Sequence, residues 1–155
     1  MRTAAEVDLR SQVEHEATTA KIADVAAYLQ EHLGQRMTAY LSGIDHAKTV
    51  GLWVAHKSEP RDLPSMRLRY AYRAARLLID AYDDETARAW FFGSNTRLDD
   101  EAPAYLLRHG TSPDDLRRMI PAAYAFVEVA APWPRPQAAA RRRQKSLPGQ
   151  RRSSA

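Results

Sequence analysis

The residues that could carry out chemistry are scattered along this 155-residue chain. Its five histidines fall in separate predicted elements, at His15, His32, His46, His56 and His109. There is no cysteine, which excludes disulfides, thiolate zinc sites and cysteine nucleophiles. The spacings of an HExxH zinc site, a nucleophile elbow, a P-loop and a dinucleotide-binding loop do not occur. We therefore expect no enzyme, no catalytic residue, no metal and no cofactor.

Two runs of three carboxylates, residues 83–85 and 99–101, could in principle hold a divalent cation. Each run stands near the start of a predicted helix, however. Acidic side chains at such positions accept hydrogen bonds from free backbone N–H groups and interact favourably with the helix dipole. We therefore interpret both runs as helix-start residues.

The formal charge changes sign along the chain, although the net charge is only +4. Residues 1–33 carry three basic and six acidic side chains, a net −3, and residues 34–82 carry eight and four, a net +4. Residues 83–131 carry five and nine, a net −4. A basic segment can face phosphates, whereas an acidic one repels nucleic acid and suits a protein partner. The division indicates two surfaces with different roles.

Residues 132–155 form a basic tail with seven basic and no acidic side chains and four prolines. This composition buries too little apolar area to offset chain entropy, so we expect the tail to be disordered in isolation. A solubilising role and a binding role both remain open. Trp133 favours binding, because an exposed tryptophan is a typical anchor on a partner.

Helical periodicity dominates the rest of the chain, and the predicted fold class is all-α. No stretch alternates apolar and polar residues over a strand's length, and no Asn-Gly or Asp-Gly turn occurs. Caps and breakers predict helices over residues 19–33, 37–41, 46–56, 65–82, 85–92, 103–109 and from 113 to about 130. Asp45, Asp84 and Ser112 are the predicted N-caps, and Pro121 should kink or split the last helix.

The predicted helix over residues 65–82 is expected to supply much of the core, since its apolar residues recur at helical spacing. Its other faces carry arginines that we expect to be available to a partner, namely Arg67, Arg69, Arg73 and Arg76. The chain length favours one domain, or one domain with tails.

Three consecutive aromatic residues, Trp90, Phe91 and Phe92, cannot all face one core from a short helix. The outward ring must be covered either by a partner or by the last helix. In the second case the covering side chains are Tyr124, Phe126 and Val127.

Residues 37–44, followed by Val50 and Trp53, have the pattern of a helix-turn-helix with Gly43 in the turn. In that geometry the second helix turns its first residues, His46, Lys48 and Thr49, to the major groove. The phosphate contacts would come from Lys57, Arg61, Arg67 and Arg69. The alternative is a helical hairpin that only packs.

A longer pattern resembles the Xre/MbcA/ParS antitoxin family. The stretch 87–91 is followed by the family's motif positions, here Trp90, Asn95, Leu98, Pro103, Leu106, Leu107 and Gly110, and resembles its toxin-binding domain. The region from Leu33 to Trp53 resembles its Xre-like helix-turn-helix. This divides the chain into an N-terminal extension (1–18), a helix-turn-helix-like region (19–82), a toxin-binding domain (83–131) and a basic tail (132–155).

The resemblance implies an antitoxin of a type II toxin–antitoxin system. Such a protein binds and inhibits a RES-domain toxin that degrades NAD, by occupying or occluding the toxin's active-site cleft. It also implies homo-oligomers, hetero-oligomers with the toxin, and repression of its own operon through operator DNA. The alternative is a stand-alone helix-turn-helix transcriptional regulator without a toxin partner.

Within this resemblance, we expect Asn95 and Leu98 to shape the fold and the last helix and the tail to contact the toxin. The candidate contacts are Arg117, Arg118, Tyr124, Phe126, Glu128, Trp133 and Arg135. The first 16 residues lack the apolar run of a secretory signal, and the stretch 119–127 is too short to cross a bilayer. We therefore predict a cytoplasmic protein with no membrane contact.

Overall fold

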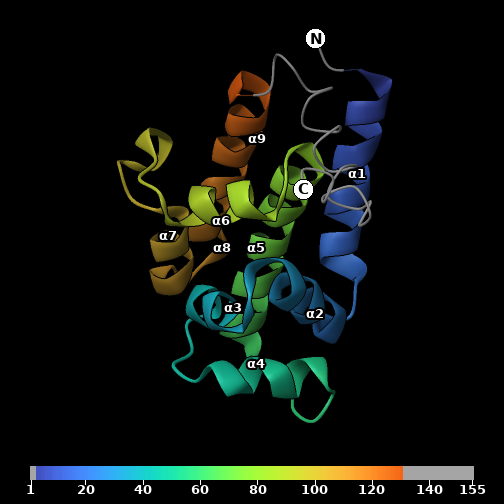
Figure 1. Ribbon diagram of the computed structural model, residues 1–155, viewed down its shortest axis with the longest axis vertical. Helices are drawn as coiled ribbons and strands as arrows, with labels where there is room; N and C mark the ends of the chain where they lie inside the picture. Colours follow the sequence, from blue (N-terminus) through green and yellow to red (C-terminus); the bar gives the residue numbers. More distant parts are fainter. Residues whose placement is uncertain (1–2, 131–155) are drawn as a thin grey trace, which may run out of the picture.

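The computed structural model describes residues 3–130, and all regular structure in that range is helical (Figure 1). The predicted all-α class is confirmed for this part of the chain, whereas Trp133, Arg135 and the rest of the predicted tail lie outside it. The elements are α1 (Ala4–Thr19), α2 (Ile22–Leu33), α3 (Gln35–Ser42), α4 (Ala47–Val54), α5 (Asp62–Ala81), α6 (Asp84–Phe92), the 3-10 helix η1 (Thr96–Leu98), α7 (Pro103–His109), α8 (Pro113–Arg117) and α9 (Met119–Ala130).

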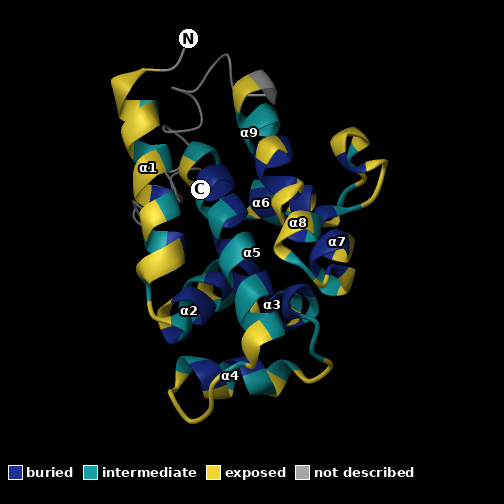
Figure 2. Cartoon of the chain, turned by 180° about the vertical axis from the view of Figure 1, so that it is seen from behind, coloured by how far each residue is buried: buried dark blue, intermediate teal, exposed yellow. Residues whose placement is uncertain are grey.

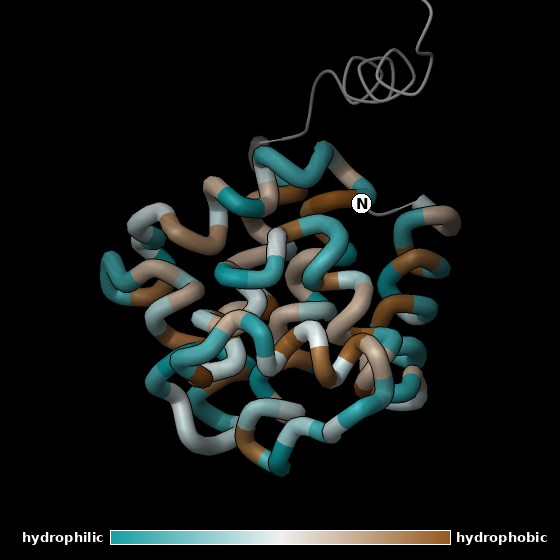
Figure 3. Tube along the Cα trace, turned by 60° about the horizontal axis from the view of Figure 1, so that its bottom comes forward, coloured by the Kyte–Doolittle hydropathy of each residue, from teal (hydrophilic) through white to brown (hydrophobic). Residues whose placement is uncertain are grey.

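Helix α5 is the central element, and it packs against α1, α2, α3, α6, α7, α8 and α9. Its predicted apolar face is buried, with no exposed surface at Leu68, Ala71, Ala75 and Leu78. The alanines allow neighbouring helices to approach closely. Hydrophobic and hydrophilic residues alternate along the surrounding helices (Figure 3). Exposed residues cover the outer face of α1 (Figure 2). The amphipathic pattern therefore organises the helices around α5.

Two predicted N-caps are wrong by one residue. Helix α4 begins after His46, and the carboxylate of Asp45 forms an ion pair instead of a cap. Helix α6 is capped by Asp83, whose carboxylate accepts from the N–H of Thr86 at 2.8 Å, rather than by Asp84. At α6 the adjacent aspartates offer the same chemistry, so the local sequence alone does not select between them, whereas His46 at the start of α4 makes no side-chain cap.

The last predicted helix is split in two, which is one of the outcomes that Pro121 predicts. Helix α8 ends at Arg117 and α9 begins at Met119. Pro121 has no N–H to donate to the carbonyl of Arg117, and its ring would clash with that carbonyl in a continuous helix. Ser112 caps α8 as predicted, its hydroxyl accepting from the N–H of Asp115 at 3.2 Å.

The predicted N-terminal extension forms most of helix α1. Its first turn is closed reciprocally, because the N–H of Glu6 donates to the Thr3 hydroxyl and the N–H of Thr3 donates to the Glu6 carboxylate. The buried side chains of α1 are Val13 and Ala17. Since this apolar face is small, polar contacts with α5 must supply a large share of its attachment.

Arg69 provides one of these contacts and is not available to DNA phosphates, which corrects its predicted role. Its Nη1 donates to the carbonyl oxygens of Ala17 at 3.0 Å and Ala20 at 2.8 Å. Carbonyls at a helix C-terminus lack intrahelical donors and carry the negative end of the helix dipole. The guanidinium of Arg69 therefore caps α1 from α5.

Arg73 and Arg76 are also engaged by α1 rather than free for a partner. Arg73 makes a bidentate ion pair with Glu14, with N–O distances of 2.5 and 2.6 Å. Arg76 pairs with Glu16 and donates to the hydroxyl of Tyr72. The acidic N-terminal segment thus neutralises part of the basic segment that the sequence indicated as a phosphate-facing surface.

Arg67 is the fourth of these arginines whose predicted availability is wrong. Only 7% of the surface of Arg67 is exposed. Both Nε and Nη2 donate to the carbonyl of Gly110, at 3.2 and 2.9 Å, while Nη1 donates to the carbonyl of Ser42 at 3.3 Å. Arg67 therefore joins the end of α3 to the end of α7 and is a structural residue.

The contact between α1 and α5 should weaken in acid. The hydrogen bond from Arg76 lowers the pKa of Glu16 from its usual value of 4.5. A carboxyl with a lowered pKa in the folded state stabilises the fold above its usual pKa, and this contribution is lost as the pH falls through the lowered value. We expect Glu16→Gln to reduce stability at pH 7 by no more than about 1 kcal/mol, because the pair is partly exposed.

The measurement is the thermal midpoint by circular dichroism at neutral pH and at pH values below 4.5. The midpoint of Glu16→Gln should fall less on acidification than that of the unchanged chain. Glu31→Gln is the matched control, since Glu31 is exposed and makes no ion pair within residues 3–130. Identical acid dependence in all three proteins would contradict the assignment.

Candidate functional site

Helix α6 separates its three aromatic residues onto different faces. Phe91 is fully buried and Trp90 is 6% exposed, with their rings edge-on and their centroids 5.2 Å apart. Phe92 is 44% exposed and lies 5.6 Å, centroid to centroid, from the ring of Tyr40 on α3. The outward ring is therefore Phe92, and it leans on α3 rather than on the last helix.

The loop after α6 is built by the motif residues themselves. The side-chain oxygen of Asn95 accepts from the N–H of Arg97 at 3.0 Å, and its backbone carbonyl accepts from the N–H groups of Leu98 and Asp100. Leu98 is fully buried. Asp99 and Asp100 then adopt positive φ angles of 57° and 68°, a conformation that aspartate tolerates better than most residues. Asn95 and Leu98 thus have the fold-shaping role that the sequence predicted.

The remaining motif residues also form structure. Pro103 opens α7, and Pro103, Leu106 and Leu107 are buried. A Cβ at Gly110 would lie 2.5 Å from the side chain of Leu116, so only glycine fits where α7 meets α8. The motif therefore specifies how residues 90–110 fold.

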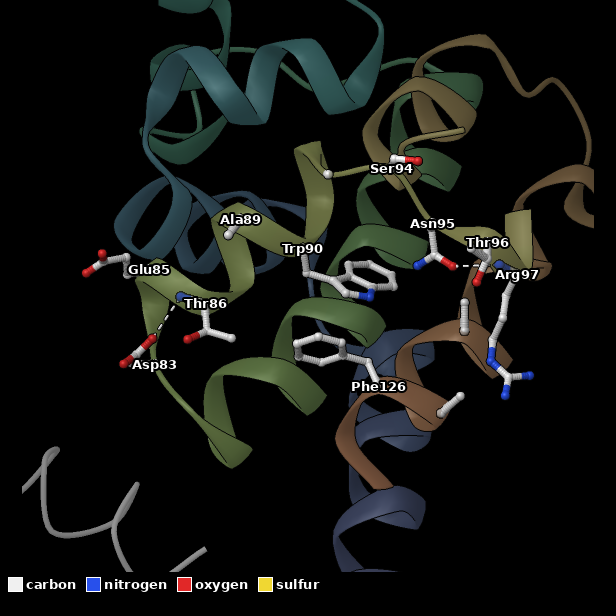
Figure 4. Close-up of a pocket in the computed structure, with 13 residues that line it drawn as sticks. Asp83, Glu85, Thr86, Ala89, Trp90, Ser94, Asn95, Thr96, Arg97 and Phe126 are labelled. Carbon is white, nitrogen blue, oxygen red and sulfur yellow. Dashed lines mark hydrogen bonds between the residues drawn. The ribbon is translucent and has the colours of Figure 1, made fainter. Parts of the chain in front are cut away.

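An open groove of about 760 Å³ lies between α6, the following loop and α9 (Figure 4). Trp90 on α6 and Phe126 on α9 form its apolar walls, and Ala122 and Ala125 line it as well. Asp83, Glu85 and Thr86 lie at one end, and Asn95 to Arg97 at the other. Because it lies between the start of the motif, at Trp90 and Asn95, and the last helix, this groove is our candidate functional site.

Three polar groups in the groove have no partner among residues 3–130. The side chains of Glu85 and Arg97 are exposed, and neither makes an ion pair or a side-chain hydrogen bond within residues 3–130. The Nε1 of Trp90 is buried and has no acceptor among the described residues. An unmade hydrogen bond at a buried donor costs about 1–3 kcal/mol. The groove thus offers an acid and a base at opposite ends, with an unsatisfied donor between them.

The structure divides the predicted toxin contacts among different faces. Phe126 lines the groove and lies 5.8 Å, ring to ring, from Tyr82. Tyr124 and Glu128 face α1, where Arg10 stacks over the tyrosine ring and makes a 3.1 Å ion pair with Glu128. Of these three residues, Phe126 alone is positioned for a partner in the groove.

Arg117 and Arg118 are exposed where α8 gives way to α9. Arg117 pairs with Asp114, three residues earlier in α8. Arg118 pairs with Asp99 at 3.1 Å. Both ion pairs are exposed, and such pairs contribute about 0–1 kcal/mol, so either arginine can exchange its carboxylate for another at little cost.

Glu85, Arg97, Ala122 and Ala125 are groove residues that the sequence interpretation missed. Glu85 belongs to a run that we interpreted as helix-start acids, and that interpretation holds for Asp83. The groove forms because α6 and α9 both pack against α5, and no pattern along the chain specifies how far apart two such helices lie. A cluster of unpaired charges could be found only from the structure.

The predicted DNA-facing residues lie at the other end of the molecule, on and beside α4 (Figure 1). Val50 and Trp53 lie on the buried face of α4, as the pattern predicts. His46, Lys48, Lys57 and Arg61 are exposed and Thr49 is half-buried. Asp45, Glu59 and Asp62 are exposed among them, which reduces the positive potential of this surface.

No family model, curated protein or solved structure matches this chain. None of the helices in residues 3–130 combines the length and the apolar character that are needed to cross a bilayer. In the same part of the chain, no three histidine or carboxylate side chains come together as a metal-binding group.

The burial of Trp90 leads to a stability prediction. Trp90→Ala should reduce the free energy of unfolding by about 3–5 kcal/mol, because it removes a buried ring beneath the groove. Phe92→Ala is the matched control on the same helix and should cost less than about 1 kcal/mol, since that ring is largely exposed. Urea denaturation followed by circular dichroism measures both, and equal losses would contradict the assigned burial.

Proposed function

We propose that this protein is the antitoxin of a type II toxin–antitoxin system and that it binds and inhibits a RES-domain toxin that degrades NAD. The observation that carries the proposal is the groove beside the motif. The resemblance concerns residues that pack inside the segment 83–130, and that segment leaves an open surface with unpaired charges and an unsatisfied donor. A surface with these properties is suited to a protein partner.

The proposed contact surface consists of the groove and the exposed junction of α8 and α9. Phe126 supplies a half-buried aromatic ring, the type of residue that dominates binding energy at interfaces. Arg117 and Arg118 supply guanidinium groups that can exchange their exposed partners for carboxylates of the toxin. Trp133 and Arg135, which follow α9 in the chain, are the remaining proposed contacts.

Inhibition in this proposal is steric. The antitoxin covers the cleft through which the toxin receives NAD, so it needs no catalytic group of its own. An interface that excludes substrate must be held for longer than a turnover, and residence time depends mainly on the dissociation rate. Burial of the aromatic groove residues is the structural feature suited to slow dissociation.

A second function is suggested by the exposed residues of α4. His46, Lys48 and Thr49 precede or occupy its first turn, where a recognition helix contacts bases, and Lys57 and Arg61 flank it. We propose that this surface binds operator DNA as part of a homo-oligomer. With a toxin partner the protein then represses its own operon, and without one it is a stand-alone helix-turn-helix regulator.

The antitoxin proposal predicts the outcome of an NAD assay. Adding the purified protein to a RES-domain toxin from the same genome should abolish NAD consumption once the two are equimolar. Arg117→Glu/Arg118→Glu should weaken inhibition about tenfold, equivalent to about 1.4 kcal/mol of binding free energy.

Arg36→Glu is the matched control for that assay, because Arg36 is an exposed arginine on α3 with no ion pair among the described residues. It should inhibit as well as the unchanged protein. NAD consumption that continues at saturating antitoxin would refute the proposed function.

The DNA proposal predicts a pattern in gel-shift assays with the region upstream of the gene. Lys48→Ala/Thr49→Ala should remove the preference for that region over unrelated DNA, because these residues would contact bases. Lys57→Ala should weaken binding to both DNAs and lower the salt dependence by about one counterion. Sequence preference that survives the double substitution would contradict the assignment to α4.

A further inference from the structure

The described chain ends one helical turn after a residue that lines the groove. Phe126, a groove residue, precedes Ala130 by one helical turn, and Ala130 is the last residue of α9. The ring of Phe126 lies 5.8 Å from that of Tyr82, and Asp83 follows Tyr82 directly. The segment that comes after α9 therefore starts about one helical turn from the groove residue Phe126.

The sequence of that next segment is suited to the groove. Residues 131–137 read Ala-Pro-Trp-Pro-Arg-Pro-Gln, and prolines at every second position prevent α9 from continuing. Three extended residues span about 10 Å, so Trp133 can fold back over the last turn of α9.

We propose that residues 132–135 fold back and occupy the groove of their own chain. The indole of Trp133 packs between Trp90 and Phe126, and the guanidinium of Arg135 pairs with Glu85.

The charges at the two ends of the groove set the direction in which the segment lies. Glu85 attracts Arg135, whereas Arg97 at the opposite end repels it. The whole tail has seven basic and no acidic side chains, so the same attraction and repulsion act on all of it. The segment 83–131 carries a net −4, which adds a general attraction.

Tethering explains why the chain's own segment is the occupant. A segment joined to the groove by a few residues has an effective concentration in the millimolar range, so even a weak contact is largely populated. Any protein that uses the groove must displace it, and its apparent affinity falls by the fraction of molecules in which the groove is free. The inference concerns the free protein and does not depend on the identity of a partner.

The absence of cysteine permits a direct test in the full-length protein. Gln137→Cys provides one attachment site for a nitroxide spin label, and the indole N–H resonances of the three tryptophans are followed by ¹H–¹⁵N NMR. A tail in the groove should make the Trp90 indole resonance lose most of its intensity. The resonance of Trp53, which is buried under α4, should keep its intensity and serves as the internal reference.

Matched variants separate docking from chance proximity. Adding Trp133→Ala/Arg135→Glu to the labelled protein should restore the Trp90 resonance, and the further change Glu85→Arg should restore part of the broadening through the reversed ion pair. If the Trp90 resonance is unaffected by the label, or unaffected by the tail substitutions, the proposal is overturned. Neither outcome alters the NAD assay, so failure here is distinct from failure of the antitoxin proposal.

A mixing experiment decides which chain supplies the tail. Spin-labelled protein without ¹⁵N is combined with unlabelled ¹⁵N protein, and a loss of intensity in this sample reports contact between molecules. We expect no loss. Broadening of Trp90 equal to that in the singly labelled sample would assign the groove to the tail of a second copy and overturn the intramolecular proposal.

Discussion

The buried guanidinium of Arg67 is the constraint on which the arrangement of this fold depends. It donates to the carbonyl of Ser42 at the end of α3 and to the carbonyl of Gly110 at the end of α7, so one charge satisfies two helix C-termini. Burial lowers the pKa of Arg67, yet an arginine starts so far above neutrality that it stays charged. A Cβ at Gly43 would lie 2.2 Å from its Nη1, so glycine is required there for space as well as for its φ of +86°.

This clamp connects the two surfaces to which we assign binding. The turn before α4 is held by Arg67 and by Arg108, which donates to the carbonyls of Tyr40 and Ile44. Both arginines are anchored at α7, which packs against α6 beneath the groove. A partner that shifts α6 or α7 would therefore also shift α4. Coupling between a toxin and DNA requires that the two ligands favour different positions of α4 relative to α7.

Local signals in the sequence predicted the elements well, and long-range partners poorly. Gly43, Ser112 and Pro121 mark helix boundaries because their effect acts within one turn of backbone. The partners of Arg69 and Arg73 lie about 50 to 60 residues away on α1. Counting charges along the chain gives the number of arginines but not their partners. The segment 34–82 is basic in sequence, yet acidic side chains of α1 neutralise part of its charge in the fold. The groove escaped prediction for the same reason, since it depends on where α6 and α9 lie on α5.

The division between structural motif and exposed groove also indicates where specificity arises. Leu98, Leu107 and Gly110 are buried, so a chain can keep the motif and the fold while its partner changes. Glu85 and Arg97 are exposed charges, each worth about 0–1 kcal/mol in an ion pair, whereas burying an aromatic ring such as Phe126 contributes about 1.5–3 kcal/mol. The rings therefore supply most of the affinity of any segment in the groove. The charges at its ends decide which segment binds and in which direction, because a reversed segment would place like charges together.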